Sequence, residues 1–248
     1  SILENSINYF LFEKSSYLRK IQKKNLKGLS VKWIQSLKDL KNYPSIFFGN
    51  EFFDAIPIKQ FVKKRNSIYE KFFKLDEKNN IQIIFQKTSK DKFKFINNFK
   101  SLKNKKFVEL PEQGFRELKK IIKIIKKNTG GVLLIDYGFN KNFDTFSLQS
   151  VINHKRNPIL KNLGKADITS LVNFKLLKEF FEKEKLNVGK IETQENFLKR
   201  YGIEQRAEII SKNMSFKSKA DLYFRLKRLI GPNLMGKHFK VIYAYANI

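Results

Sequence analysis

Polar side chains follow two apolar runs of this chain, and these side chains are the best candidates for chemistry. In "SIFFGNEFFDAIP" the apolar run ends at Asn50, and Glu51 and Asp54 come shortly after it. In "VLLIDYGF" four apolar residues precede Asp136 and Tyr137. An apolar run of this kind is typical of a buried parallel strand, and open α/β sheets bind ligands at the carboxyl ends of such strands. We therefore expect a ligand site that contains these carboxylates.

The sequence leaves a structural alternative open for each candidate. Asp54 either faces a ligand or caps the turn that follows it, a common use of Asp. Asp136 either shapes the pocket or caps the next loop. His154 is either a site residue or a polar packing residue, while His238, beside the last apolar run, is interpreted as structural. No spacing of His, Asp and Glu suggests a metal site.

The elements that must position these residues alternate between helical and strand patterns, which favours the α/β class. A segment of three β-rich runs at 58–87 interrupts the alternation and predicts an antiparallel meander with turns at 65–67 and 76–80. The segment 140–170 has no strong periodicity and is expected to be rich in loops. Strands are predicted at 29–35, 45–50, 132–135 and 237–246, and helices at 15–27, 114–129, 170–184, 204–213 and 218–229.

Composition narrows the class of protein. The 248 residues contain no cysteine, so disulfides and cysteine nucleophiles are excluded. The net charge of +28 suggests nucleic-acid binding, but 43 of the 51 basic residues are Lys and only 8 are Arg, the residue preferred for bidentate phosphate contacts. Lys is spread along the chain beside abundant Ile, Asn and Phe, which share A/T-rich codons. We therefore favour a biased composition with a solvated basic surface, and we expect no nucleic-acid partner and no membrane span.

Five segments in the same order resemble the MidA-like family of class I SAM-dependent methyltransferases. They are "FGNEFFDAIPIKQF" (48–61), "GVLLIDYGF" (131–139), "DTFSLQSVINHKRNPILKNLGKADITSLVNF" (144–174), "TQENFLKRYGI" (193–203) and "RLIGPNLMGKHFKVIYA" (228–244). The resemblance implies a Rossmann-like sheet that lacks part of its N-terminal half, with an antiparallel β insertion and a loop and helix insertion. The expected divisions are 1–57, 58–108, 109–139, 140–236 and 237–248, in which 1–57 is the remainder of the cofactor-binding half.

The same resemblance implies S-adenosyl-L-methionine (SAM) as cofactor. Glu13, after a strand in "YFLFEKSSYLRKIQ", is expected to accept both ribose hydroxyls. Trp33 and Ser36 are expected to wall the adenine, and Asn50 to lie beside the methyl donor, although Trp33 alone is also a common core residue. The family's Gly-rich loop is expected upstream of Ser1, so the chain is interpreted as a C-terminal fragment that lacks this loop.

For the substrate, the resemblance implies methylation of a protein arginine to a symmetric dimethyl product, in support of respiratory complex I assembly. A guanidinium presents a rigid fork of donors that matches carboxylates, so Glu51 and then Asp54 are the expected guanidinium ligands, with Asp136 as a third acidic site residue. Tyr137, His154 and Asp167 are further substrate-side candidates; Asp167 and Thr169 are otherwise interpreted as caps of the following helix.

The partner expected from the resemblance is a complex I subunit of the 49-kDa type. The compartment would be the cytoplasm in a bacterium or the mitochondrial matrix in a eukaryote. Two other function classes remain open. A nucleic-acid methyltransferase would carry Asn or Asp followed by Pro-Pro and an aromatic residue, where this chain has "NEFF". A basic, noncatalytic RNA-binding or assembly module would rest on the charge alone.

Overall fold

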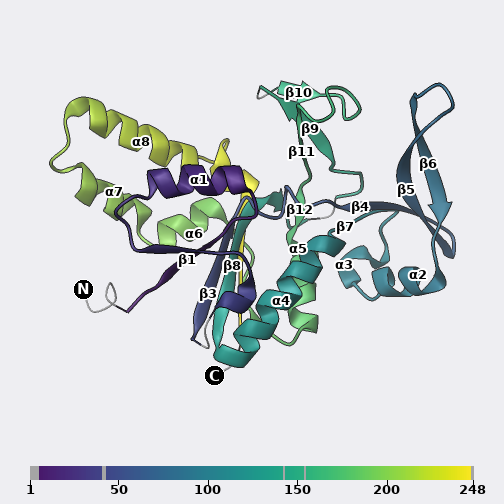
Figure 1. Ribbon diagram of the computed structural model, residues 1–248, viewed down its shortest axis with the longest axis horizontal. Helices are drawn as coiled ribbons and strands as arrows, with labels where there is room; N and C mark the ends of the chain where they lie inside the picture. The colour runs from purple at the N-terminus through teal and green to yellow at the C-terminus, as the bar shows by residue number, and fades with distance from the viewer. Residues whose placement is uncertain (1–5, 41–42, 142, 154, 247–248) are drawn as a thin grey trace.

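The computed structural model describes residues 6–40, 43–141, 143–153 and 155–246. Its main sheet is built around β8 (Gly130–Phe139), as shown in Figure 1. Two strands pair parallel to one edge of β8, first β3 (Ser45–Asn50) and then β12 (Val172–Asn173), and β15 (Phe239–Tyr245) pairs antiparallel to the other edge. The short strands β13 (Asn187–Val188) and β14 (Glu192–Thr193) pair with β15.

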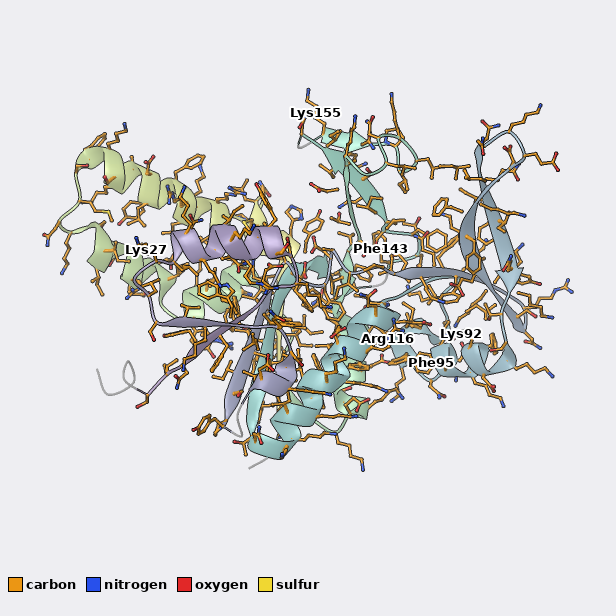
Figure 2. All side chains as sticks on the ribbon, viewed as in Figure 1. Lys27, Lys92, Phe95, Arg116, Phe143 and Lys155 are labelled. Carbon is orange, nitrogen blue, oxygen red and sulfur yellow. The ribbon has the colours of Figure 1, made fainter. Side chains whose placement is uncertain are left out.

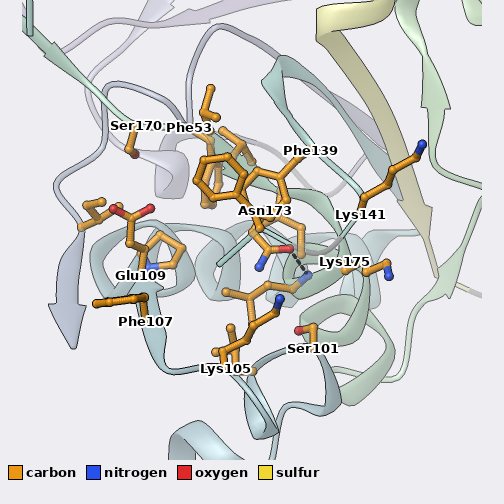
Figure 3. A pocket seen from close by; sticks show the side chains of 18 of the residues that line it. Phe53, Ser101, Lys105, Phe107, Glu109, Phe139, Lys141, Ser170, Asn173 and Lys175 are labelled. Atoms are coloured by element: carbon orange, nitrogen blue, oxygen red, sulfur yellow. Dashed lines mark hydrogen bonds between the residues drawn. The ribbon is translucent and has the colours of Figure 1, made fainter. Parts of the chain in front are cut away.

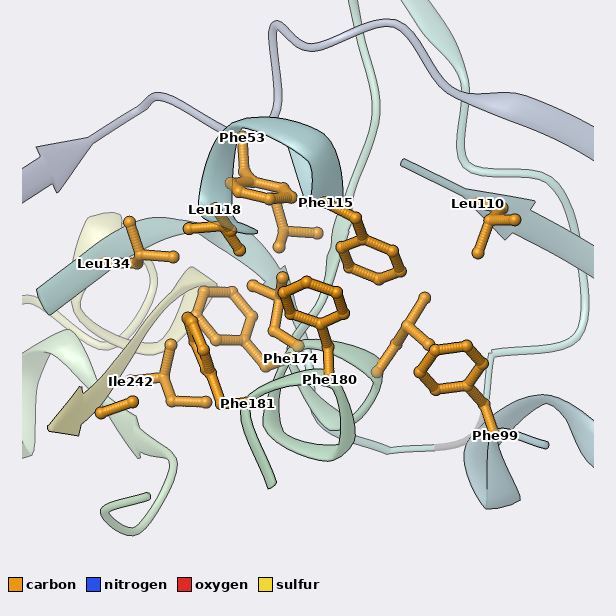
Figure 4. Packing of buried hydrophobic residues seen from close by; sticks show 14 of the residues in the cluster. Phe53, Phe99, Leu110, Phe115, Leu118, Leu134, Phe174, Phe180, Phe181 and Ile242 are labelled. Atoms are coloured by element: carbon orange, nitrogen blue, oxygen red, sulfur yellow. The ribbon is translucent and has the colours of Figure 1, made fainter. Parts of the chain in front are cut away.

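One face of this sheet is covered by α4 (Glu112–Asn128) and α5 (Phe174–Lys183), the two helices with the clearest apolar stripes. The rings of Phe115 and Phe180, one from each helix, stack with centroids 4.1 Å apart. Figure 4 shows these rings packed with Leu134 and Ile242 of the sheet. The predicted apolar face of α4 is confirmed, because Phe115, Leu118, Ile122 and Ile125 are buried and Ile121 packs against the same cluster.

The helices within residues 194–230 lie at the other side of the molecule from the β insertion (Figure 1). α6 and α9 contact β15, and α9 also contacts β8, while α7 and α8 pack against each other and α8 against α6. The predicted helices near 204–213 and 218–229 are therefore confirmed, and two short helices were not predicted. The bounds are α6 (Gln194–Arg200), α7 (Ile203–Ser211), α8 (Phe216–Ile230) and α9 (Met235–His238).

The predicted insertion is a four-stranded antiparallel sheet in the order β6-β5-β4-β7. Both predicted turns are present, and Arg65 and Asn79 adopt the positive φ angles of tight turns, 50° and 61°. The insertion contains elements that were not predicted, because a fourth strand and two helices follow the three-stranded meander. Its elements are β4 (Lys59–Lys64), β5 (Ser67–Leu75), β6 (Ile81–Lys87), α2 (Lys90–Asn97), α3 (Lys100–Lys103) and β7 (Phe107–Leu110).

Two segments form small sheets of their own. β1 (Tyr9–Phe12) and β2 (Val31–Ile34) pair in parallel and are joined by α1 (Ser16–Asn25), whose N-cap is Ser15. The expectation of loops at 140–170 was wrong in part, because β9 (Gln149–Ile152), β10 (Lys155–Asn157) and β11 (Asp167–Thr169) form an antiparallel sheet. The strands are short, so the sequence gives little alternation to detect.

The prediction that 45–50 is a buried strand was also wrong. Alternate side chains of β3 point away from the core, with Ile46 83% exposed and Phe48 64% exposed. Phe47, between them, packs against the core cluster. The exposure arises because β3 pairs with β8 alone among the described strands, and its outer face is uncovered.

Candidate functional site

The acidic segment, defined here as residues 50–54, leaves the carboxyl end of β3 and turns over the end of β8. Its path is fixed by Asp136 of β8, which is 2% exposed. The Asp136 Oδ2 accepts hydrogen bonds from the backbone N–H groups of Phe53 (2.7 Å) and Asp54 (3.3 Å), and Oδ1 accepts one from Tyr137 N–H (2.8 Å). Asp136 therefore holds the loop that carries Asp54, and its oxygens already have backbone partners.

The electrostatics of Asp136 follow from this burial. The pKa of Asp136 is raised to about 7, mainly by desolvation and in part by the neighbouring charge of Asp54. The three backbone N–H donors oppose these two effects, since they favour the charged carboxylate. A cation bound next to Asp54 would favour ionisation of both acids.

Asp54 and Glu51 differ in their surroundings. Asp54 is half-buried, and burial is the main cause that raises its pKa, with Glu51 adding a repulsive charge. Glu51 is exposed and has a φ angle of 48°. This left-handed conformation is energetically unfavourable for any residue other than glycine. The Glu51 N–H donates to the carbonyl of Ile135 (3.0 Å), and Asn50 Nδ2 lies 3.4 Å from Glu51 Oε1. The segment thus presents two carboxylates, one partly desolvated and one open.

Other substrate-side candidates are placed differently. Tyr137 is half-buried, and its ring lies 5.9 Å from that of His238 and 5.8 Å from that of Phe239, between ring centroids. Asp167 is exposed on β11, within the small sheet of β9 to β11. The predicted His154 lies outside the described residues.

The expectation that Asp167 and Thr169 cap the next helix was wrong. The helix α5 begins at Phe174, and its N-cap is Asn173, whose side chain accepts a hydrogen bond from Leu176 N–H (3.1 Å). The residues before it pair as β12, so Asp167 and Thr169 lie too far upstream to cap the helix.

The cofactor-side candidates gather at the carboxyl ends of β1 and β2. The two carboxylate oxygens of Glu13 accept hydrogen bonds from Ser15 N–H (2.8 Å) and Gln22 Nε2 (3.2 Å). Gln22 in turn accepts from Trp33 Nε1 (3.0 Å), so a chain of hydrogen bonds orients both Glu13 and Trp33. Each Glu13 oxygen keeps a second lone pair, and the fixed carboxylate therefore suits a vicinal diol such as a ribose.

Ser36 has a structural role that the sequence analysis did not predict. Its side chain accepts from Lys38 N–H, and Asp39 accepts from Ser36 N–H, which is a capping box for a short 3₁₀ turn. Asn50, the other predicted cofactor residue, lies with Glu51 on the main sheet. The structure therefore divides the predicted site between two sheets that share no strand pairing among the described residues.

A cavity of about 50 Å³ adjoins the acidic segment, as Figure 3 shows. Phe53 of the acidic segment lines this cavity. Ser170 lines it too, and its N–H donates to the carbonyl of Asp54 (3.1 Å). Glu109 lies at its wall and accepts from Gln60 Nε2 and from Ser147 N–H, at 2.7 and 2.9 Å. Glu109 thereby ties the insertion to the loop after β8, a role that no local sequence pattern marks.

The basic surface has no single focus. Figure 2 shows Lys27, Lys92 and Lys155 on separate parts of the molecule, after α1, on α2 and on β10. Within the described ranges, no group of three His, Cys, Asp or Glu side chains is arranged to hold a metal ion. None of the helices described is both long enough and apolar enough to cross a membrane.

Comparison with known proteins gives the family of the chain. Residues 1–191 match the model of a family described as "putative S-adenosyl-L-methionine-dependent methyltransferase". The chain is 28% identical over 214 residues to the protein arginine methyltransferase NDUFAF7, mitochondrial, of Danio rerio, covering 86% of this chain and 50% of that protein. It is 29% identical over 181 residues to the Caenorhabditis elegans homolog, covering 72% and 42%. The chain thus spans about half the length of these relatives.

The fold is shared with a solved bacterial structure. A protein from Burkholderia thailandensis with bound S-adenosyl-homocysteine superposes with a TM-score of 0.78 at 18% identity, covering 97% of this chain and 64% of that one. At this identity the likeness establishes the fold alone. The family model matches residues 1–191, well over half of the chain, and the chain therefore belongs to the MidA-like family of S-adenosyl-L-methionine-dependent methyltransferases.

Proposed function

We propose that this chain carries the substrate side of a protein-arginine methyltransferase site, with the acidic segment as the guanidinium-binding element. The observation that supports this most is the pair of carboxylates at the end of β3, one half-buried and both on a loop that Asp136 fixes. The names of the relatives, which are protein arginine methyltransferases, support the same substrate class.

The chemistry requires both binding and proton acceptance. A guanidinium donates hydrogen bonds in a planar fork, so Glu51 and Asp54 together would fix its orientation and its distance from the methyl donor. When one guanidinium nitrogen gains a methyl group, it also loses a proton. Asp54 is the better acceptor of that proton, because burial raises its pKa. Glu51, which is exposed, would orient the substrate.

The residues proposed to bind the cofactor lie on the small sheet of β1 and β2. S-adenosyl-L-methionine supplies an activated methyl group when it is bound, and a relative of the same fold was solved with the demethylated product, S-adenosyl-homocysteine. Glu13 fits the ribose, since its carboxylate is held rigidly by Ser15 and Gln22. The face of Trp33 is the candidate for the adenine, because its Nε1 is already bonded to Gln22.

The proposed compartment is supported by the relatives, and the proposed partner rests on the family resemblance. The zebrafish and nematode relatives are named mitochondrial. We propose a complex I subunit of the 49-kDa type as the substrate, and we expect the compartment to follow the source, the cytoplasm of a bacterium or the matrix of a mitochondrion.

Binding of guanidinium can be tested without the cofactor. Titration of the chain with an arginine-containing peptide, followed by calorimetry, should show binding that Glu51→Gln weakens by roughly tenfold, the effect expected for one charge-assisted hydrogen bond. Asp221→Asn is the matched control, since Asp221 is an exposed carboxylate on α8. Equal affinity of wild type and Glu51→Gln would contradict the assignment.

Transfer is the second test. The chain is incubated with labelled S-adenosyl-L-methionine, a 49-kDa-type subunit and RNA, and the labelled residue is identified. Label on an arginine of the subunit, lost in Glu51→Gln, supports the proposal. Label on RNA alone would favour a nucleic-acid methyltransferase instead.

A further inference from the structure

We propose that a hollow between α2, α4 and α5 is a second ligand site, which binds a small molecule made of a planar aromatic group and an anionic group. The hollow has a volume of about 310 Å³ and shares no lining residue with the cavity beside the acidic segment. The proposal is therefore independent of the methyl-transfer chemistry proposed above.

The first observation is the aromatic floor of this hollow. The rings of Phe99, Phe115 and Phe180 follow one another, with centroid distances of 6.0 Å from Phe99 to Phe115 and 4.1 Å from Phe115 to Phe180 (Figure 4). The Phe95 ring meets the Phe99 ring edge-on at 5.5 Å between centroids. The first three side chains are buried, but Phe95 is 42% exposed. A ligand ring in the hollow can therefore pack against Phe95 at an ordinary aromatic contact distance of about 4.5–7 Å.

The second observation is an excess of positive charge at the rim. The charged residues that line the hollow are Lys92, Glu112, Arg116, Lys119, Lys183 and Glu184. Lys92 pairs with Glu112, and Lys119 Nζ lies 3.5 Å from Glu184 Oε1. Among the residues that the structure describes, Arg116 and Lys183 have no carboxylate partner. Both acids of the rim are thus paired, and two cations remain available to an anion.

The third observation is the kind and place of these two cations. Only 8 of the 51 basic residues are Arg, and a guanidinium binds a carboxylate or a phosphate through two parallel hydrogen bonds. Arg116 is exposed on α4 and lies with Lys92 and Phe95 at the hollow, as Figure 2 shows. Lys183 Nζ lies 5.4 Å from the centroid of the Phe99 ring, which places the second charge over the aromatic floor. A ligand that packs its ring against Phe95 can therefore direct its anionic group to Arg116.

The volume limits the class of ligand. Small-molecule pockets commonly measure about 300–1,000 Å³, are mostly apolar and carry a few polar groups that orient the ligand. At about 310 Å³ this hollow suits a single small molecule. A purely apolar ligand would leave both cations without an anion, and an inorganic anion would leave the Phe95 ring exposed. The hollow therefore favours a ligand that carries both groups.

Three probes separate the two parts of such a ligand. Naphthyl phosphate carries both parts, naphthol lacks the anion, and inorganic phosphate lacks the ring. Each probe is titrated into the chain by calorimetry at about 0.15 M salt, which screens the general attraction of a basic protein for anions. We expect naphthyl phosphate to bind more tightly than either other probe by roughly tenfold or more.

Two substitutions test the two parts of the site. Arg116→Gln removes the guanidinium and Phe95→Ala removes the exposed ring, and each should weaken binding of naphthyl phosphate by roughly tenfold or more. The matched controls are Arg206→Gln, at an exposed position of α7, and Phe216→Ala, at a position of α8 that is 89% exposed. Both controls should bind naphthyl phosphate as wild type does. Unchanged thermal unfolding of Arg116→Gln shows that its fold is intact.

Four outcomes would overturn the proposal. Equal affinity for naphthyl phosphate and inorganic phosphate would mean that the hollow is only part of a basic surface. Equal affinity for naphthyl phosphate and naphthol would mean that the contact is only apolar. Absence of binding by all three probes, or wild-type affinity for naphthyl phosphate in either Arg116→Gln or Phe95→Ala, would contradict the site itself.

Discussion

Replacement of Asp136 by Asn should change how the free energy of unfolding depends on pH, while the variant still folds. Asn keeps the volume and one acceptor oxygen, but its NH₂ group faces one of the backbone N–H donors, at a cost of about 1–3 kcal/mol at any pH. The wild-type carboxyl lowers stability at neutral pH, because its pKa is about 7 in the folded state against 3.8 for an unperturbed Asp side chain. The unfolded state therefore ionises first, and stability falls as pH rises from about 4 to 7.

The size of this effect follows from the two pKa values. Between pH 5 and pH 8, linkage gives a loss of roughly 2.6 kcal/mol in the wild-type free energy of unfolding from this carboxyl alone. The Asn variant lacks that loss, so its stability relative to wild type should improve by the same amount over this range.

Urea denaturation of both proteins at pH 5, 6, 7 and 8 measures the difference. Asp221→Asn is the control, because Asp221 is exposed. A difference between wild type and Asp136→Asn that stays constant over this range would refute the reasoning, since it would mean that Asp136 ionises as an ordinary surface carboxyl.

Three further substitutions test contacts that hold the acidic segment and the insertion in place. Glu51→Gly removes the strain of a φ angle of 48°, so it should raise the free energy of unfolding by roughly 1 kcal/mol in urea while weakening arginine-peptide binding. Gly114→Ala places a Cβ 2.6 Å from the Phe53 ring, and overpacking should lower stability by about 1–3 kcal/mol despite the better helix propensity of Ala; an unchanged midpoint would contradict this. Lys63→Met removes hydrogen bonds from Nζ to the Asn97 side chain and the Leu102 carbonyl, so hydrogen exchange should increase in α2 and α3, and unchanged protection there would argue against this anchor.

The sequence predicted the elements whose pattern is long or carries distinct end signals. The helix α4 has an apolar residue at nearly every helical repeat, and the turns at Arg65 and Asn79 lie in short polar runs between β-rich segments. The acidic segment was found because parallel strands direct their carboxyl ends to one edge.

The remaining features depend on contacts that are distant in sequence. The burial of a strand is decided by its neighbours, so "SIFFGN" has the composition of a central strand although no other described strand pairs with its outer edge. The role of Asp136 was left open because its partners, Phe53 and Asp54, lie 83 and 82 residues away. Ser36 was assigned to the cofactor because it follows the predicted strand at 29–35. Its capping box was missed because the N3 residue is Asp39, where the usual pattern has Glu or Gln.

The pairing of β4 with β7 has a consequence for the order of folding. The hydrogen bond from Phe53 to Asp136 closes a loop of 83 residues. The pairing of Lys59 with Leu110 brings the two ends of the insertion together, so the remaining open loop has roughly 33 residues, and the entropy cost of closing it falls by about 0.8 kcal/mol. An insertion that forms first would therefore speed formation of the site. A charge placed at Val62, which is buried and pairs with Phe107, should slow refolding in stopped-flow fluorescence more than it speeds unfolding.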